Sequence, residues 1–207
     1  MPLIKQTEVD LGRIKGVIFD LDGTLASSNP DFDSLCAELE ICRGVDILKW
    51  LDDIECPDRK ASANAVIHRY ELESSARAEW IPGAQVLVDY LHSAGLPTAI
   101  LTRNIRQAAG VTLGRLGCSI PAVLTREDAP AKPSPEGILM MCREWGIAPH
   151  ECLYVGDYLF DLQTAANAGA MSLLYNVQQP VPEYAAMADM VTDDYLALVE
   201  ALKLAGH

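Results

Sequence analysis

Residues 15–25 read Lys-Gly-Val-Ile-Phe-Asp-Leu-Asp-Gly-Thr-Leu. The apolar run 17–19 predicts a buried strand, and Asp20 and Asp22 follow it directly, just before the turn residue Gly23. Two carboxylates at the end of a buried strand repel each other, and a hard divalent cation with oxygen ligands offsets this repulsion. The stretch therefore predicts a reactive site in which one aspartate attacks as a nucleophile while its neighbour transfers a proton.

Further short apolar runs recur along the chain, at 98–101, 122–124, 153–155 and 172–174. Segments with helical spacing lie between them. Residues 84–94 place apolar side chains on one helical face before Gly95, and Ser134-Pro135-Glu136 predicts the start of a helix that ends near Gly146. Strands that alternate with helices are typical of a parallel sheet covered by helices. We therefore expect an α/β fold with a Rossmann-like parallel sheet.

Residues 29–80 follow a different pattern, with helical spacing of apolar residues and no convincing strand. Pro57 interrupts this pattern, and Ile81-Pro82-Gly83 marks the return to the sheet. We expect a small all-helical cap of two or three helices at 29–80, inserted into a core domain formed by residues 1–28 and 81–207.

The composition limits the partners of this protein. The chain has 207 residues and a net charge of −13, whereas binding to nucleic acid or to an anionic membrane is led by clustered Lys and Arg. We therefore expect neither partner, and an anionic substrate would need a local cationic site. The chain has no apolar run of about 18 residues and no signal-peptide pattern, so we expect a cytoplasmic protein. The six cysteines form no CxxC pair, which favours reduced thiols over a zinc or disulfide framework.

Polar side chains follow the expected strands at the points where they end. Because the functional crevice of an open parallel sheet lies beyond the carboxyl ends of its strands, we expect these side chains to converge. The residues concerned are Asp20, Asp22, Thr102, Arg103, Asn104, Lys132, Asp157 and Asp161.

This order of motifs resembles the haloacid dehalogenase-like (HAD) hydrolase superfamily, whose members carry an Asp-x-Asp pair, a strand-end Thr or Ser, a Lys and a late acidic motif. The resemblance covers nearly the whole chain. Within this superfamily, the chain is similar in particular to phosphoglycolate phosphatase-like members, which have a small helical cap between the first two motifs. Many of those relatives continue the first motif with an acidic residue, whereas Leu25 is followed here by Ala-Ser-Ser-Asn-Pro, so the specific substrate stays open.

The resemblance implies a role for each catalytic candidate. Asp20 would attack phosphorus and form an aspartyl phosphate that water later hydrolyses. Asp22 would protonate the leaving alkoxide and then deprotonate the water, and its presence favours phosphate chemistry over carbon–halogen cleavage. Lys132 and the Thr102 hydroxyl would stabilise the phosphoryl oxygens.

The resemblance also implies a Mg²⁺ site. Asp20, the backbone carbonyl of Asp22 and Asp157 would supply oxygen ligands, and Asp161 would act through water or by holding Lys132. Three further residues are candidates for substrate binding. Gly23 would let backbone amides approach the phosphate. Arg103 and Asn104 are the other two, although Arg103 can equally point to solvent and Asn104 can equally cap a helix.

The leading hypothesis is a Mg²⁺-dependent phosphatase that hydrolyses a small phosphorylated metabolite. A phosphomutase that passes the phosphoryl group to a second sugar hydroxyl is an alternative, and a catalytically idle binding protein is another. Substrate entry predicts that the cap moves, with hinges near 26–30 and 81–83. The oligomeric state stays open.

Overall fold

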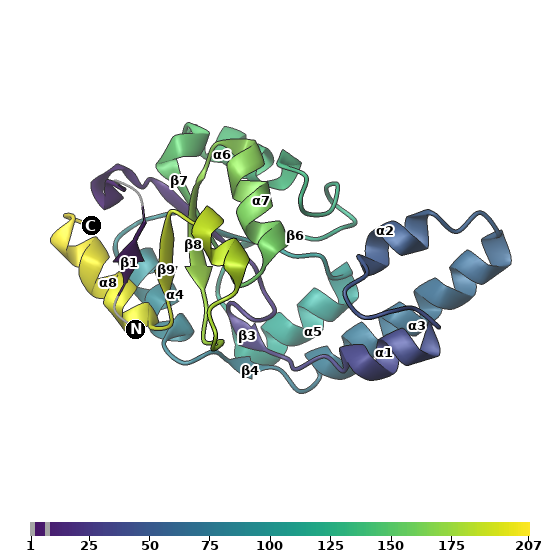
Figure 1. Ribbon diagram of the computed structural model, residues 1–207. Coiled ribbons are helices and arrows are strands. Elements are labelled where there is room, and N and C mark those ends of the chain that lie inside the picture. The colour runs from purple at the N-terminus through teal and green to yellow at the C-terminus, as the bar shows by residue number, and fades with distance from the viewer. Residues whose placement is uncertain (1–2, 7–8) are drawn as a thin grey trace.

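The computed structural model describes residues 3–6 and 9–207, and over these residues a seven-stranded sheet forms the centre of the protein (Figure 1). The strand order is β1-β9-β8-β7-β2-β5-β6, and all neighbours are parallel except β1 and β9. The strands are β1 (Ile4–Lys5), β2 (Gly16–Phe19), β5 (Thr98–Leu101), β6 (Ala122–Leu124), β7 (Cys152–Gly156), β8 (Met171–Tyr175) and β9 (Met190–Thr192). The expected α/β fold and its five strands are confirmed, while β1 and β9 were not predicted.

Helices cover both faces of the sheet because side chains of a strand alternate between faces. Val17 and Phe19 of β2 pack with α4 and α8 in one core cluster, while Ile18 packs with α6 and α7 in another. Each of these three side chains is fully buried, which contributes about 1.5–3 kcal/mol per residue. The helices around the sheet are α4 (Ala84–Ser93), α5 (Arg106–Leu116), α6 (Glu136–Trp145), α7 (Leu159–Ala168) and α8 (Tyr195–Leu204), with short 3-10 helices at Leu11–Arg13, Pro149–Glu151 and Glu183–Met187.

The predicted helix boundaries agree with the structure to within about one residue. Helix α6 begins at Glu136, whose N–H donates to the Ser134 hydroxyl over 3.3 Å, and it ends before Gly146, which has a φ of 67°. Glycine at this position accepts the left-handed conformation that closes a helix.

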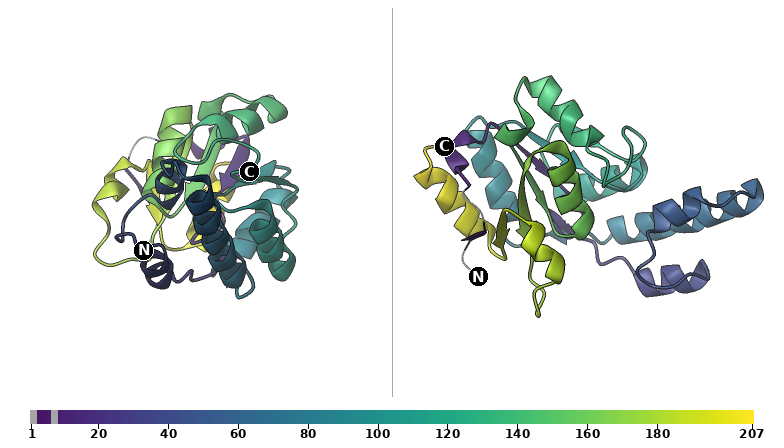
Figure 2. Two further views of the ribbon diagram at one scale, coloured as in Figure 1. Left: turned by 90° about the vertical axis from the view of Figure 1, so that its right-hand side faces the viewer. Right: turned by 45° about the horizontal axis from the view of Figure 1, so that its top comes forward.

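Residues 32–75 form a separate group of helices at one end of the molecule, projecting away from the sheet (Figures 1 and 2). They are α1 (Phe32–Glu38), α2 (Ile47–Asp52) and α3 (Pro57–Ser75), which we call the cap helices. Leu35, Leu51 and Ile67 belong to a hydrophobic cluster of their own. Pro57 occupies the first turn of α3, where its missing N–H costs no hydrogen bond. This arrangement is consistent with the expected domain boundaries, which stay a prediction.

The chain segments that enter and leave the cap helices pair with each other. Strand β3 (Ala26–Ser27) lies antiparallel to β4 (Glu79–Trp80), with Ala26 opposite Trp80. The Trp80 indole N–H also donates to the Leu116 carbonyl over 2.9 Å, which ties β4 to the end of α5. Strand β3 lies within the predicted hinge at 26–30, whereas β4 comes just before the one at 81–83, in the segment expected to hold no strand. The ladder was not predicted.

Within the described residues, every helix is too short or too polar to span a bilayer. All six cysteines are free thiols.

Candidate active site

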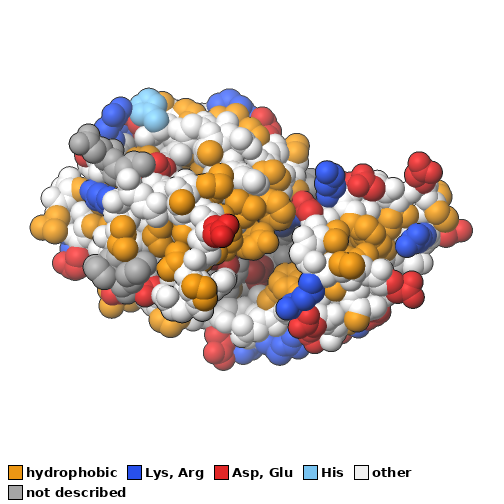
Figure 3. Space-filling model, viewed as in Figure 1, with side chains coloured by type: hydrophobic (Ala, Val, Ile, Leu, Met, Phe, Trp, Pro, Cys, Tyr) orange, Lys and Arg blue, Asp and Glu red, His pale blue; other side chains and the backbone are white. Residues whose placement is uncertain are grey.

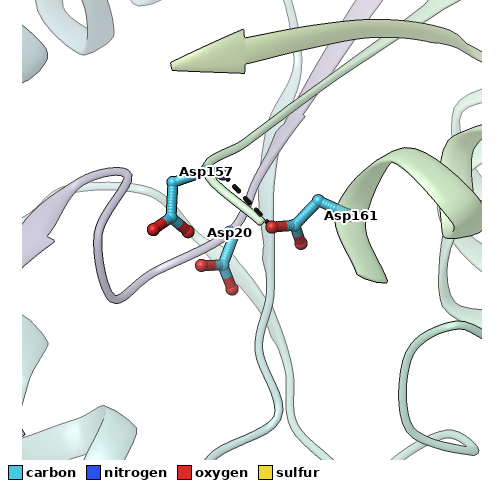
Figure 4. A group of neighbouring side chains, drawn as sticks. All are labelled: Asp20, Asp157 and Asp161. Atoms are coloured by element: carbon cyan, nitrogen blue, oxygen red, sulfur yellow. Dashed lines mark hydrogen bonds between the residues drawn. The ribbon is translucent and has the colours of Figure 1, made fainter. Parts of the chain in front are cut away.

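The carboxyl ends of the central strands bring acidic side chains together. Asp20 follows β2, Asp157 follows β7, and Asp161 lies in the first turn of α7. Figure 4 shows the three carboxylates grouped at this edge of the sheet, and their candidate ligand oxygens all lie within 4.8 Å of one another. The convergence expected from the strand ends is therefore present in the structure.

Lys132 places a buried ammonium among these carboxylates. Its Nζ lies 2.5 Å from Asp20 Oδ1 and 2.7 Å from Asp161 Oδ1, and the residue is 5% exposed. Burial alone would lower the pKa of Lys132, but attraction to Asp161 and Asp20 outweighs it and raises the pKa. Lys132 therefore stays charged and fixes the position of the Asp20 carboxylate.

Asp161 is held by donors on both of its oxygens. Oδ1 accepts from Lys132 and, over 3.1 Å, from the Tyr154 hydroxyl, while Oδ2 accepts from the N–H groups of Asp157 (3.2 Å) and Tyr158 (3.0 Å). A carboxylate has about four acceptor positions, so this one is fully used. Of the roles expected for Asp161, the geometry matches that of holding Lys132.

Burial and mutual repulsion disfavour the ionised forms of the other two carboxyls. Burial raises the pKa of Asp20 to about 7 against the opposing effect of Lys132, and burial with repulsion from Asp20 and Asp161 raises the pKa of Asp157 well above its ordinary value. One ammonium faces three carboxylates in this cluster. A divalent cation with oxygen ligands would offset the remaining charge, so the donor set fits Mg²⁺.

Asp22 points to a different set of partners. The Ser28 hydroxyl donates to its Oδ1, and the Asn104 side-chain amide donates to its Oδ2 over 2.6 Å. Burial raises the pKa of Asp22, whereas these two hydrogen bonds lower it. The Asp22 carboxylate lies outside the group formed by Asp20, Asp157 and Asp161, so its backbone carbonyl is the part of Asp22 that stays a candidate metal ligand.

Gly23 supports the cluster in a way that differs from the expectation. Its N–H donates to the Ala26 carbonyl over 2.8 Å, so this amide is engaged within the turn, and the expected contact of nearby backbone amides with a phosphate stays a prediction. Its φ of +84° favours glycine, and a Cβ here would lie 2.1 Å from Asp157 Oδ2. Gly23 therefore makes room for Asp157.

Thr102 lies at the end of β5, and Arg103 and Asn104 follow it. The buried Thr102 Oγ1 accepts from the N–H of Asn104 over 3.1 Å, which keeps its own hydrogen available for donation. Arg103 forms an ion pair with Asp46 at the start of α2, and its guanidinium lies 4.3 Å above the Phe160 ring. The predicted substrate-binding arginine is thus engaged by the cap helices, and Asn104 contacts Asp22.

Sequence reasoning missed Ser28, Tyr154 and Asp46. Tyr154 carried a usable signal, since it is the one residue with a polar tip in the apolar run 153–155. Neither Ser28 nor Asp46 showed a signal in the sequence, because their contacts depend on how the segments around the cap fold back onto the sheet.

Comparisons with known proteins agree with this geometry. The sequence model of the haloacid dehalogenase-like hydrolase family matches residues 17–175. A haloacid dehalogenase-like hydrolase domain-containing protein of Arabidopsis thaliana is 31% identical over 174 residues, covering 78% of this chain and 71% of the relative. A phosphoglycolate phosphatase of Xylella fastidiosa is 30% identical over 180 residues, covering 76% and 78%.

A solved structure shows the same fold. A hydrolase from Pseudomonas syringae superposes with a TM-score of 0.78 at 21% identity, covering 92% of this chain and 98% of that one. The resemblance inferred from the motifs is confirmed: the chain belongs to the haloacid dehalogenase-like hydrolase family.

Proposed function

We propose that this protein is a Mg²⁺-dependent phosphatase that hydrolyses a small phosphate monoester through an aspartyl phosphate on Asp20. The observation that carries the proposal is the placement of two carboxyls with separate partners. Lys132 holds Asp20 within the group of carboxylates that would bind the metal, while Ser28 and Asn104 hold the Asp22 carboxylate apart from that group. A nucleophile and a proton carrier need such separate environments.

In the first step, an Asp20 oxygen forms a bond to phosphorus as the ester oxygen leaves with a proton from Asp22. In the second step, Asp22 removes a proton from the water that attacks the same phosphorus, and the Asp20–phosphorus bond breaks. Lys132 and the Thr102 hydroxyl supply a charge and a donor toward the phosphoryl oxygens. The raised pKa of Asp22 is consistent with a carboxyl that carries its proton for part of the cycle.

Asp20, Asp157 and the backbone carbonyl of Asp22 would hold the metal, and Asp161 would act through Lys132. When bound, Mg²⁺ supplies positive charge that offsets the carboxylates and the phosphoryl group. The relatives named phosphatases support a hydrolytic reaction on a phosphorylated compound.

The test is phosphate release from a broad panel of phosphate monoesters by the purified protein, with Mg²⁺ and with a chelator. We expect release that needs Mg²⁺ and that Asp20→Asn abolishes, whereas Asp52→Asn, an exposed change on α2, leaves it intact. Absence of release across the panel, or full activity of Asp20→Asn, would contradict the proposal. Isomerised sugar phosphate without free phosphate would instead indicate a mutase.

A further inference from the structure

Partly buried ion pairs join the loops after two strands of the sheet to the cap helices. Arg103, after β5, pairs with Asp46 at the start of α2, and these side chains are 20% and 25% exposed. Arg126, after β6, pairs with Glu71 of α3 over 2.5 Å, with exposures of 12% and 17%. The Arg126 Nη1 also donates to the Arg103 carbonyl over 2.6 Å, so the two pairs support each other.

Arg103 lies next to the candidate catalytic groups. Its chain neighbours Thr102 and Asn104 are both site residues, and its guanidinium stacks on Phe160, which directly precedes Asp161. Figure 3 shows the hollow between the cap and the sheet, with hydrophobic side chains gathered on both sides of it. The guanidinium of Arg103 therefore connects the end of β5, beside the site residues Thr102 and Asn104, to the start of the cap helix α2.

The charge of Arg103 is already neutralised in the structure. Lys132 is paired with Asp20 and Asp161, Arg103 with Asp46, and Arg126 with Glu71, while Arg103 Nη1 and Arg126 Nη2 are buried without a hydrogen-bond partner among the described residues. A second anionic group on a substrate would have to displace the Asp46 carboxylate or lie beside it. Like charges brought together in a partly buried site are strongly disfavoured.

We propose that Asp46 is a specificity-determining residue: by occupying Arg103, it makes the site select phosphate esters of uncharged alcohols, such as polyols, and reject esters whose alcohol carries a carboxylate or a second phosphate. This inference rests on the proposed phosphatase activity and narrows its substrate class. Asp46 acts as an internal carboxylate that stands in the place of the substrate's second anion.

The test compares matched esters in which a hydroxymethyl group replaces the carboxylate: hydroxyethyl phosphate with phosphoglycolate, and glycerol phosphate with phosphoglycerate. We expect the wild-type kcat/KM to favour the uncharged member of each pair by about tenfold or more. Asp46→Asn should raise kcat/KM for the acidic member by about tenfold, mainly through KM, and change the uncharged member by less than about threefold.

The variant is well matched to the structure. Asp46 is the N-cap of α2 and accepts from the N–H of Lys49, and asparagine caps helices equally well. Asp52→Asn, on the same helix but paired with Lys60, removes the same charge away from Arg103 and should leave the preference unchanged. Adding Arg103→Gln to Asp46→Asn should remove the gain for acidic esters, because the freed guanidinium provides it.

A wild-type enzyme that prefers the acidic esters or does not discriminate, an unchanged preference in Asp46→Asn, or a gain that survives Arg103→Gln overturns the inference. If other esters are hydrolysed but these are not, the same compounds are compared as competitive inhibitors of the best ester, and equal or tighter inhibition by the acid overturns it. Absence of phosphate release from every ester of the broad panel contradicts the phosphatase proposal instead.

Discussion

Lys132 Nζ lies 2.7 Å from Asp161 Oδ1, and this contact gives Asp161 a role distinct from that of Asp157. The Asp161 carboxylate accepts hydrogen bonds from Lys132, from Tyr154 and from two backbone amides. Asp157 is instead a partly buried carboxyl whose ionised form is disfavoured by its surroundings. The first is a structural anchor of the site and the second is a candidate metal ligand.

Asp161→Asn should therefore lower the stability of the metal-free protein, whereas Asp157→Asn should remove its stabilisation by Mg²⁺. Removing the Asp161 charge takes a partner from a buried ammonium and should lower the free energy of unfolding by about 3 kcal/mol. Asp157→Asn should change the metal-free stability by less than about 1 kcal/mol but abolish the rise of Tm that Mg²⁺ produces. Urea unfolding and thermal melts with and without Mg²⁺ measure both effects. The reverse pattern would mean that the two roles are exchanged.

The raised pKa of Asp20 predicts that the response to Mg²⁺ depends on pH. The folded-state pKa of about 7 lies above the ordinary aspartate value of 3.8, so the metal-free folded protein loses stability as pH rises between these values, since the unfolded chain ionises first. Mg²⁺ binds only the ionised carboxyl. The Mg²⁺-induced increase in Tm should thus be larger at about pH 8 than at about pH 6. An increase that is equal at both values would count against the buried, proton-competing site.

The two donors to Asp22 predict a shift in the pH profile of turnover. Asn104→Ala removes a hydrogen bond that favours the ionised form of Asp22, so the pKa of Asp22 should rise. The fall of kcat/KM on the high-pH side of its pH profile, where Asp22 loses its proton, should therefore move to higher pH. We expect kcat to fall by about tenfold, less than the about 100-fold or more of Asp22→Asn. Ser28→Ala should shift the limb in the same direction. A profile unchanged in both variants would remove Asp22 from the acid–base role.

The sequence was sufficient for the central strands and for the carboxylates and lysine of the cluster. Asp20 and Asp157 come at the ends of apolar runs, and the carboxyl ends of parallel strands meet at one edge of the sheet. Lys132 lies in the loop after β6 and was identified from the order of the motifs. Strand β1 escaped prediction because its 2 residues are too few to show a pattern, and β9, which has 3 residues, was not predicted either.

The partners of Arg103 and Gly23 could not be predicted for another reason. Arg103 meets Asp46 across 57 residues, and only the placement of α2 against the sheet brings them together. The Gly23 amide looked available for a phosphate because the sequence does not show that the turn closes on Ala26. Contacts that depend on tertiary placement rather than on strand ends lie beyond periodicity and motif spacing.

The ion pair between Arg126 and Glu71 predicts how much the contact between cap and sheet contributes to the free energy of unfolding. Glu71→Gln leaves a largely buried guanidinium without its carboxylate, so the free energy of unfolding should fall by about 3 kcal/mol. Glu38→Gln is the matched control, because Glu38 pairs with Arg69 in the open, where ion pairs contribute little. Urea unfolding compares the two. Equal losses would show that the connection between cap and sheet does not depend on this pair.

Gly23 and Gly44 provide a test of whether the turn after β2 serves the metal site. Both have a positive φ, of +84° and +85°, but a Cβ at Gly44 meets no atom within 4 Å, whereas one at Gly23 meets the Asp157 carboxylate. Each change to alanine should cost about 1–2 kcal/mol of stability for the left-handed backbone. The atoms displaced at Gly23 belong to the end of a side chain, so Gly23→Ala should fold, yet its Tm should no longer respond to Mg²⁺ because Asp157 must turn away. Gly44→Ala should keep the full response. A normal Mg²⁺ response in Gly23→Ala would show that the metal does not need Asp157 in this position.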